Sequence, residues 1–193
     1  MGLSILIAGL VLFLGVHLVT TMRDKRAGLI ARFGENGYKA LYSILSAIGL
    51  ALIVYGFARY RAEGWIELWS PPAWTKHLAA LFVLFAMIML VSAYARGHIY
   101  ERLKHPMLAG VKLWALAHLM ANGDLGSLIL FGSVLAWAVI DRISLKHRTD
   151  PGGPPIPVGG WHNDVIAIFG GVALYAALGW WFHPYVIGVP VIG

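Results

Sequence analysis

The sequence predicts an all-α fold, a polytopic integral membrane helix bundle of about six transmembrane helices. Hydrophobic residues make up 59% of the 193 positions and charged residues only 12%, whereas soluble domains carry about a quarter charged residues. The eight Trp and eight Tyr agree with this class, because amphipathic rings collect at membrane interfaces. No hydrophilic stretch is long enough to fold separately, so residues 1–193 are expected to form a single transmembrane domain.

Six apolar runs predict the spans, because each comes near the ~20 residues that cross ~30 Å of hydrocarbon. They cover approximately residues 3–20, 38–58, 77–94, 107–121, 125–140 and 165–181. The first run has neither a basic leader nor a convincing cleavage site, which favours a retained helix over a signal peptide. The fourth and fifth share the tight turn Asn122-Gly123-Asp124, which predicts an antiparallel helical hairpin.

Three other segments do not have the pattern of a span. Residues 65–74 and 149–160 are rich in Pro or Gly and are expected to be loops. The apolar end, residues 183–193, is broken by Pro184 and Pro190, so it can lie along the membrane surface.

Charge predicts the orientation. Basic residues concentrate after the first, third and fifth spans, with Arg23, Lys25, Arg26, Arg32 and Lys39 forming the largest group. These three segments lie on one side, so the positive-inside rule predicts that both termini face outward. The same distribution accounts for the net charge of +6 without a nucleic-acid partner.

Histidine is the obvious metal ligand in this chain. The sequence has eight His and no Cys, which excludes disulfides, iron–sulfur clusters and thiolate ligands. His77 and His98 are 21 residues apart, roughly 31 Å along a helix, so they cannot share a ligand. His105 and His17 belong near the inner surface, whereas His77 and His118 lie near the outer level of consecutive spans. His77 and His118 are therefore the pair that can hold a haem between facing helices.

Two of these features also have plain structural explanations. His77 can be an interfacial residue at a helix start, with His118 hydrogen-bonded to Asn122 one turn further on. In Lys104-His105-Pro106, Pro106 suits the first turn of a helix because its missing N–H costs little there. The same helix start can bind a phosphate, a carboxylate or a haem propionate through its free amides. Both interpretations of each feature remain open from the residues alone.

A longer motif resembles a known family. Residues 104–124 and 135–142, with Gly15-Val16-His17 and the stretch from Pro71 to His77, resemble the NnrU family over nearly the whole chain. The resemblance implies a multi-pass protein of the bacterial inner (cytoplasmic) membrane, associated with denitrification and nitric-oxide metabolism. The related 15-cis-zeta-carotene isomerases are membrane haem b enzymes whose iron is held by histidines. Carried over by motif, the cofactor-binding residues would be His17, His77, His105 and His118.

The resemblance and the depth argument favour different iron ligands. The family resemblance pairs His118 with His17 as iron ligands, whereas the expected depth of the histidines in the membrane pairs His118 with His77. We therefore rank His118 first, His77 second and His17 third. The related isomerases have a cysteine three residues before the histidine that matches His118. Here that residue is Ala115, so the isomerase mechanism cannot be transferred whole.

The leading functional prediction is a haem b-binding membrane protein of NnrU type, linked to nitric-oxide metabolism or to isomerisation of a lipophilic polyene. One alternative is a methyltransferase resembling the isoprenylcysteine carboxyl methyltransferases, which is weakened because Lys104 and Met107 depart from their motif and paired glutamates are missing. Another is a non-catalytic accessory or assembly subunit of a respiratory or denitrification complex. The expected partners are the lipid bilayer, a lipophilic small molecule or nitric oxide, and a membrane complex or a second copy of the chain.

Overall fold

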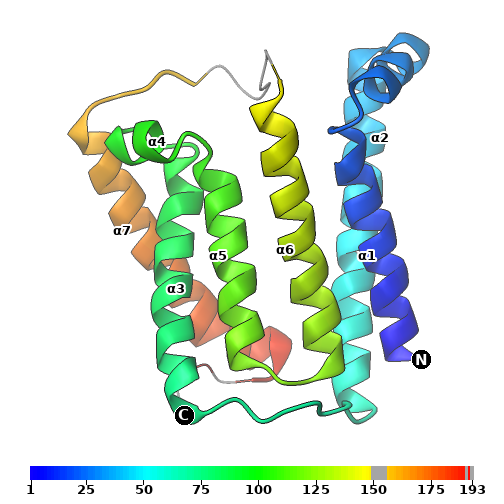
Figure 1. Ribbon diagram of the computed structural model, residues 1–193, viewed down its shortest axis with the longest axis vertical. Helices are drawn as coiled ribbons and strands as arrows, with labels where there is room; N and C mark the ends of the chain where they lie inside the picture. The colour runs from blue at the N-terminus through cyan, green and yellow to red at the C-terminus, as the bar shows by residue number, and fades with distance from the viewer. Residues whose placement is uncertain (149–155, 190, 192–193) are drawn as a thin grey trace. The chain divides into compact units, whose positions relative to one another are not determined.

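The computed structural model describes residues 1–148, 156–189 and 191. Helices account for 81% of the chain, and the described residues form no strand, so the all-α prediction is confirmed. The helices labelled in Figure 1 are α1 (Gly2–Val19), α2 (Arg23–Ala62), α3 (Ala73–Ser92), α4 (His98–Leu103), α5 (Pro106–Ala121), α6 (Leu125–Lys146) and α7 (Trp161–Ala177). The π-helix η1 (Leu178–Ile187) continues α7.

Length and composition support the predicted spans. Five helical segments among the described residues are long and apolar enough to cross a membrane: α1, α2, α3, α6 and the continuous segment Trp161–Ile187. The remaining predicted span corresponds to α5, which is apolar but has only 16 residues. At 1.5 Å per residue it is roughly 24 Å long, shorter than the ~30 Å hydrocarbon layer. The outward orientation of both termini stays a prediction.

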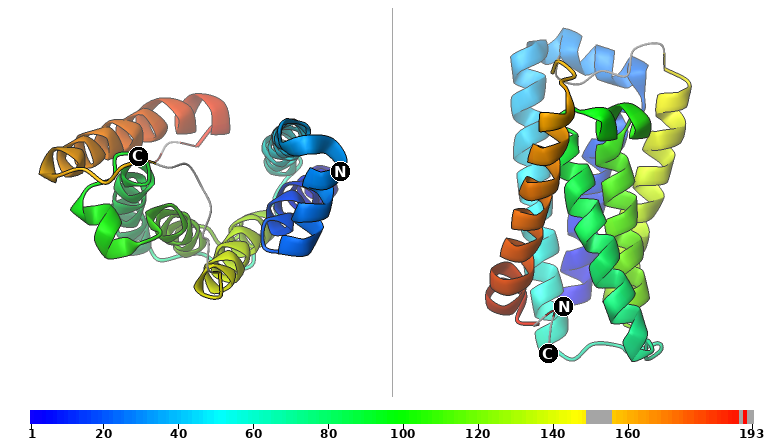
Figure 2. Two further views of the ribbon diagram at one scale, coloured as in Figure 1. Left: turned by 90° about the horizontal axis from the view of Figure 1, so that it is seen from above. Right: turned by 90° about the vertical axis from the view of Figure 1, so that its left-hand side faces the viewer.

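Helix α2 begins earlier than its apolar run. Its first arm, residues 23–33, is basic and was not expected to be helical, because hydropathy detects only segments that are apolar throughout. Gly34 then leaves the helical conformation, with φ 71° and ψ 166°. That positive φ is accessible to glycine and strained for other residues. The second arm, residues 35–62, therefore runs in a different direction from the first (Figure 2).

The end of the chain also differs from expectation. Residues beyond 181 were expected to leave the helix, yet η1 continues to Ile187 with Pro184 inside it. A proline normally breaks an α-helix because it lacks an N–H and crowds the preceding turn. Here the wider π-helical turns carry the chain through Pro184, and π-helical segments occur frequently at functional sites.

The helices pack as two compact units. Unit 1 comprises Met1–Trp69 and Gly123–Thr149, with α1, α2 and α6, and unit 2 comprises Ser70–Asn122 and Asp150–Gly193, with the other helices. The turn Asn122-Gly123-Asp124 that joins α5 to α6 crosses the boundary between them. The hairpin expected at this turn therefore stays a prediction, and each unit is described by itself.

Glycines bring α1 and α2 of unit 1 into close contact. A Cβ on Gly9 of α1 would lie 2.7 Å from the backbone N of Ile53, and one on Gly49 of α2 would lie 2.8 Å from the backbone N of Phe13. Gly2 and Gly56 lie even closer to the backbone of the facing helix. Small residues at such contacts are how helices associate in lipid, where the hydrophobic effect does not drive them together.

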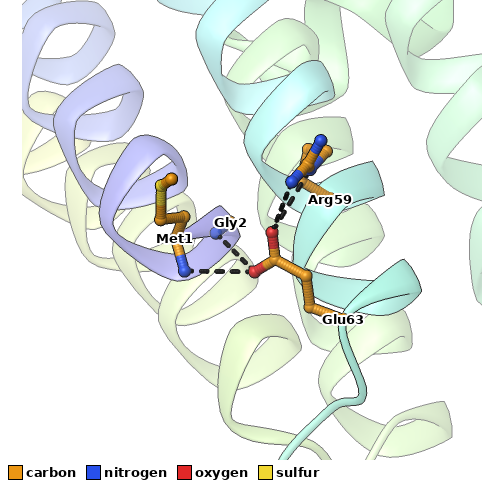
Figure 3. A network of polar contacts seen from close by, with 4 residues as sticks. All are labelled: Met1, Gly2, Arg59 and Glu63. Carbon is orange, nitrogen blue, oxygen red and sulfur yellow. Dashed lines mark hydrogen bonds and ion pairs between the residues drawn. The ribbon is translucent and has the colours of Figure 1, made fainter.

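A carboxylate ties the two ends of this helix pair together (Figure 3). Glu63, which follows α2, accepts hydrogen bonds from the backbone N–H of Gly2 at 2.9 Å and from the Met1 amino group at 3.1 Å. The Arg59 guanidinium donates to its other oxygen at 2.9 Å. These three donors lower the pKa of Glu63 from 4.5 to about 2. The Gly2 amide has the largest effect on this pKa, and Arg59 and the Met1 amino group have smaller ones.

The Glu63 contacts predict an acid-sensitive contribution to stability. A folded-state pKa below the ordinary value means that the contribution is complete above about pH 4.5 and is lost as the pH falls toward about 2. Glu63→Gln should therefore melt below the wild type at pH 7, and the difference should shrink between pH 4.5 and pH 2. Thermal unfolding of the detergent-solubilised protein across this range measures it. The control is Glu101→Gln, an exposed carboxyl on α4; a gap that stays constant with pH would contradict the prediction.

In unit 2, α3 packs against α5 and α7 through the same kind of contact. A Cβ on Gly110 would lie 2.8 Å from the Ala86 carbonyl oxygen, and one on Gly171 would lie 2.5 Å from Ile88 Cα. The short helix α4 is capped from α7 by Asp164, whose carboxylate accepts from the backbone N–H groups of His98 and Ile99 at 3.1 and 2.9 Å. These contacts hold the α4–α5 connection, which contains the Lys104-His105-Pro106 motif, against α3 and α7.

Candidate functional site

His17 lies among aromatic rings in unit 1. Its ring centroid is 4.2 Å from that of Phe13, 5.2 Å from that of Tyr42 and 5.5 Å from that of Trp137, which meets it edge-on at 86°. Its Nδ1 is 2.7 Å from the Phe13 carbonyl oxygen, one turn earlier on α1. A carbonyl oxygen only accepts hydrogen bonds, so Nδ1 donates, and Nε2 carries the lone pair of the neutral ring.

Polar atoms gather around this aromatic cluster. The Tyr38 hydroxyl and the Trp137 indole N–H are buried without a hydrogen-bond partner among the described residues. One turn beyond Trp137 on α6, Asp141 accepts from Arg148 at 2.9 Å, and both side chains are largely buried. Buried donors that lack a partner are uncommon in folded proteins and call for an explanation. Unit 1 therefore combines an imidazole with unmatched polar groups near one end of its helices.

His118 occupies a comparable setting in unit 2. Its Nδ1 donates to the Trp114 carbonyl oxygen at 2.8 Å, again one turn earlier, and the two ring centroids are 4.8 Å apart. The expected contact with Asn122 exists, but Asn122 Nδ2 donates to the backbone carbonyl oxygen of His118 at 2.8 Å. The imidazole is therefore not the group that Asn122 engages.

The structure brings His118 together with His183 of η1. Their ring centroids are 6.1 Å apart, with an angle of 30° between the ring planes. His183 is not among the site residues predicted from the sequence, because a structural role is favoured for a histidine that flanks the last predicted span. The signal in the sequence that could have extended the last predicted helix past Pro184 is the apolar run from Tyr185 to Ile187.

The other two candidate histidines have different environments. His77 is exposed near the start of α3, so the idea that it faces His118 stays a prediction. His105 precedes α5, whose first residue is Pro106, as expected. The His105 N–H donates to the Leu103 carbonyl oxygen at 2.7 Å around Lys104, whose φ is 61°. This is the tight three-residue γ-turn, a strained conformation for a residue with a side chain.

The remaining histidines are peripheral. His98 is exposed and its Nδ1 pairs with Asp164 at 2.8 Å, so it belongs to the cap of α4. His147 and His162 are exposed as well. Within the described part of the chain, no group of three or more His, Asp or Glu is arranged to hold a metal ion. A haem requires only one or two axial ligands from the protein, so His17 and His118 remain the candidates with the most suitable surroundings.

One comparison with known proteins identifies the chain's relatives. A family model described as "NnrU protein" matches residues 5–191, nearly the whole chain. This match extends over both units. No curated protein and no solved structure gives a significant match.

Proposed function

Because this chain belongs to the NnrU family, we propose that it is a haem b-binding membrane protein, with His118 and His17 as candidate iron ligands. The observation that carries the proposal is the arrangement that the two residues share. Each donates from Nδ1 to the carbonyl oxygen four residues earlier, His17 to Phe13 and His118 to Trp114. Histidines that bind metals typically donate the other ring N–H in this way, which orients the ring and makes the ligating nitrogen more basic.

The surroundings of both rings suit a porphyrin. Phe13, Tyr42 and Trp137 surround His17, and Trp114 lies against His118. These large flat side chains offer the apolar surface that the faces of a haem require, as in other helical bundles that hold a cofactor. The chain's own contribution would be to bind and orient the group and to limit the access of water to it.

A bound haem b would supply an iron that changes oxidation state and takes small ligands such as nitric oxide. Two reaction classes follow as proposals: redox chemistry linked to nitric oxide, and isomerisation of a lipophilic polyene. Ala115, three residues before His118, is fully buried and provides no thiolate. Ligand exchange with a cysteine at this position is thus excluded for this chain. The proposal includes the bacterial cytoplasmic membrane as the location.

Absorption spectroscopy tests the proposal. Protein purified in detergent from haem-replete cells should show a Soret band, with sharpened α and β bands after dithionite reduction. His118→Ala and His17→Ala should each lower the haem bound per chain by about tenfold or more, since even indirect partners of a metal ligand contribute 10- to 100-fold to affinity. His77→Ala and His183→Ala show whether either residue takes part.

The matched control is His162→Ala, which removes an exposed histidine of α7. It should keep the wild-type spectrum and the wild-type elution volume in gel filtration. A colourless wild-type preparation would contradict haem binding. If His162→Ala and His118→Ala both fold and lose the same amount of haem, the assignment of His118 as an iron ligand is contradicted.

A further inference from the structure

Two imidazole rings from different helices meet in unit 2. His118 belongs to α5 and His183 to η1, and both side chains are partly buried. Their ring centroids are 6.1 Å apart, with 30° between the ring planes. Because Nδ1 of His118 donates to the Trp114 carbonyl oxygen, Nε2 carries the lone pair of its neutral ring. Ionisable residues inside membrane domains are costly to place there, so they usually have a function.

The backbone of η1 fixes the position of His183. Its carbonyl oxygen accepts from the N–H groups of Gly188 and Val189, the latter at 3.2 Å. A π-helix has about 4.4 residues per turn and an α-helix about 3.6, so over the six residues (183 − 177) from Ala177 to His183 the π-helix turns about 110° less. The π-helical segment thus changes the side of the helix from which His183 projects. In the observed direction, the ring meets α5.

Hydrogen bonding does not account for this contact. The His183 ring makes no hydrogen bond to any described residue, His118 included. Polar groups in the interior of native proteins are normally paired with protein, water or a ligand. A metal ion held between the two rings would give both imidazoles a partner.

The distance between the rings indicates how such a metal ion would be coordinated. Metal–nitrogen bonds to imidazole are about 2.0 Å long, and the ring centre lies about 1 Å beyond the nitrogen. Two imidazoles on opposite sides of one metal ion therefore have ring centres about 6 Å apart, whereas two at a tetrahedral angle have centres about 5 Å apart. The observed 6.1 Å matches the opposed arrangement.

Opposed imidazoles suit a haem iron better than a bare metal ion. A structural zinc ion takes four protein ligands in a tetrahedron, and no group of three or more His, Asp or Glu in the described part of the chain could hold one. A haem needs only two protein ligands, on opposite faces of the porphyrin. Gly179, one turn before His183, leaves open space on η1, because a Cβ there would meet nothing within 4 Å.

We propose that His118 and His183 are the two axial ligands of one haem iron in unit 2. This assignment rests on the proposed binding of haem and names the residue opposite His118. Both ligands belong to the same unit, so their pairing does not depend on how the two units are arranged. Iron with two imidazole ligands is low-spin and has no open position. A small ligand such as nitric oxide therefore has to displace one of the two histidines.

The spin state of the iron tests this pairing. Wild-type protein purified in detergent with haem b should give low-spin ferric spectra, both by optical absorption and by electron paramagnetic resonance. His183→Ala should retain part of the haem through His118, and that haem should be high-spin because one strong ligand is gone. Free imidazole should restore the low-spin spectra. Carbon monoxide should bind reduced His183→Ala at least about tenfold faster than reduced wild type, since no imidazole has to leave.

Three further variants make the result specific. The haem that remains in His17→Ala should stay low-spin, because His17 is not the residue opposite His118. Trp181→Phe alters a side chain of the same helix that is 65% exposed, and it should leave the spectra unchanged. His183→Gln keeps the size and polarity of the side chain and should also give high-spin haem, even if His183→Ala does not fold. Helical circular dichroism confirms that each variant folds.

Four outcomes would overturn the pairing. A colourless wild type would contradict haem binding itself, and the pairing with it. Low-spin haem in folded His183→Ala and His183→Gln would contradict the pairing alone. High-spin haem in His17→Ala would assign the second position to His17. Zinc or copper in place of iron, detected by elemental analysis of the wild type, would show that a bare ion occupies the two histidines.

Discussion

Replacing Gly56 with leucine is expected to force α1 and α2 apart and to lower the free energy of unfolding of unit 1 by about 3 kcal/mol or more. The Cβ would fall against the backbone of α1, 2.8 Å from both Ile5 C and Leu6 Cα. Backbone atoms inside a helix cannot rotate away as a side chain can. Relief therefore requires the helices to separate, which also weakens the contacts of buried Leu6 and Ile53.

Thermal stability followed by fluorescence-detected gel filtration measures the effect of Gly56→Leu. Gly15→Leu is the control, because it adds the same side chain to α1 at a position where a Cβ meets nothing within 4 Å. The control should elute and melt like the wild type, whereas Gly56→Leu should aggregate or melt at a much lower temperature. Similar behaviour of the two variants would show that the close approach of α1 and α2 does not hold the unit together.

The second large effect is expected at Asp124, which precedes α6. Its carboxylate accepts from the Ser127 backbone N–H at 2.9 Å and from the Ser127 hydroxyl at 2.6 Å, and the residue is only 6% exposed. Asp124→Ala should lower the free energy of unfolding by about 2 kcal/mol, the upper range for a lost helix cap. Part of that cost is the buried Ser127 hydroxyl, which would lose its acceptor.

Asp124→Asn separates capping from charge. Asparagine caps helices about as well as aspartate, so this variant should retain most of the stability that Asp124→Ala loses. Asp24→Ala removes an exposed carboxylate from the first turn of α2 and should change the midpoint only slightly. Chemical denaturation in detergent, monitored by circular dichroism, ranks the three variants. An Asp124→Ala protein as stable as Asp24→Ala would refute the capping role.

The spans could be predicted from the sequence because hydropathy sums over many residues and tolerates local exceptions. The first arm of α2 could not be predicted in this way, because its charged residues lower the hydropathy of the segment. The break at Gly34 depends on the conformation of one residue. The continuation of the last helix was missed for a related reason. A proline within an apolar stretch usually ends a helix, and only the π-helical geometry around Pro184 allows it to continue.

The candidate site was predictable only in part. Motif resemblance selected His17 and His118, and their bonds to the preceding carbonyl oxygens are local to α1 and α5. The proximity of His118 and His183 joins residues 65 positions apart (183 − 118) and depends on how α7 and η1 fold in unit 2. Likewise, the aromatic cluster around His17 of α1 joins Tyr42 of α2 and Trp137 of α6, which no local pattern encodes.

The glycines of α1 and α2 also limit how far the two helices can slide. Gly2 and Gly9 are seven residues apart, as are Gly49 and Gly56, so a shift of seven residues would again bring Gly2 opposite Ile53 and Gly49 opposite Leu6. Glycine spacing alone therefore also permits registers shifted by roughly 10 Å along the helices. Only the observed register brings the amide of Gly2 to the carboxylate of Glu63. Glu63 thus selects the register in which the helix pair assembles.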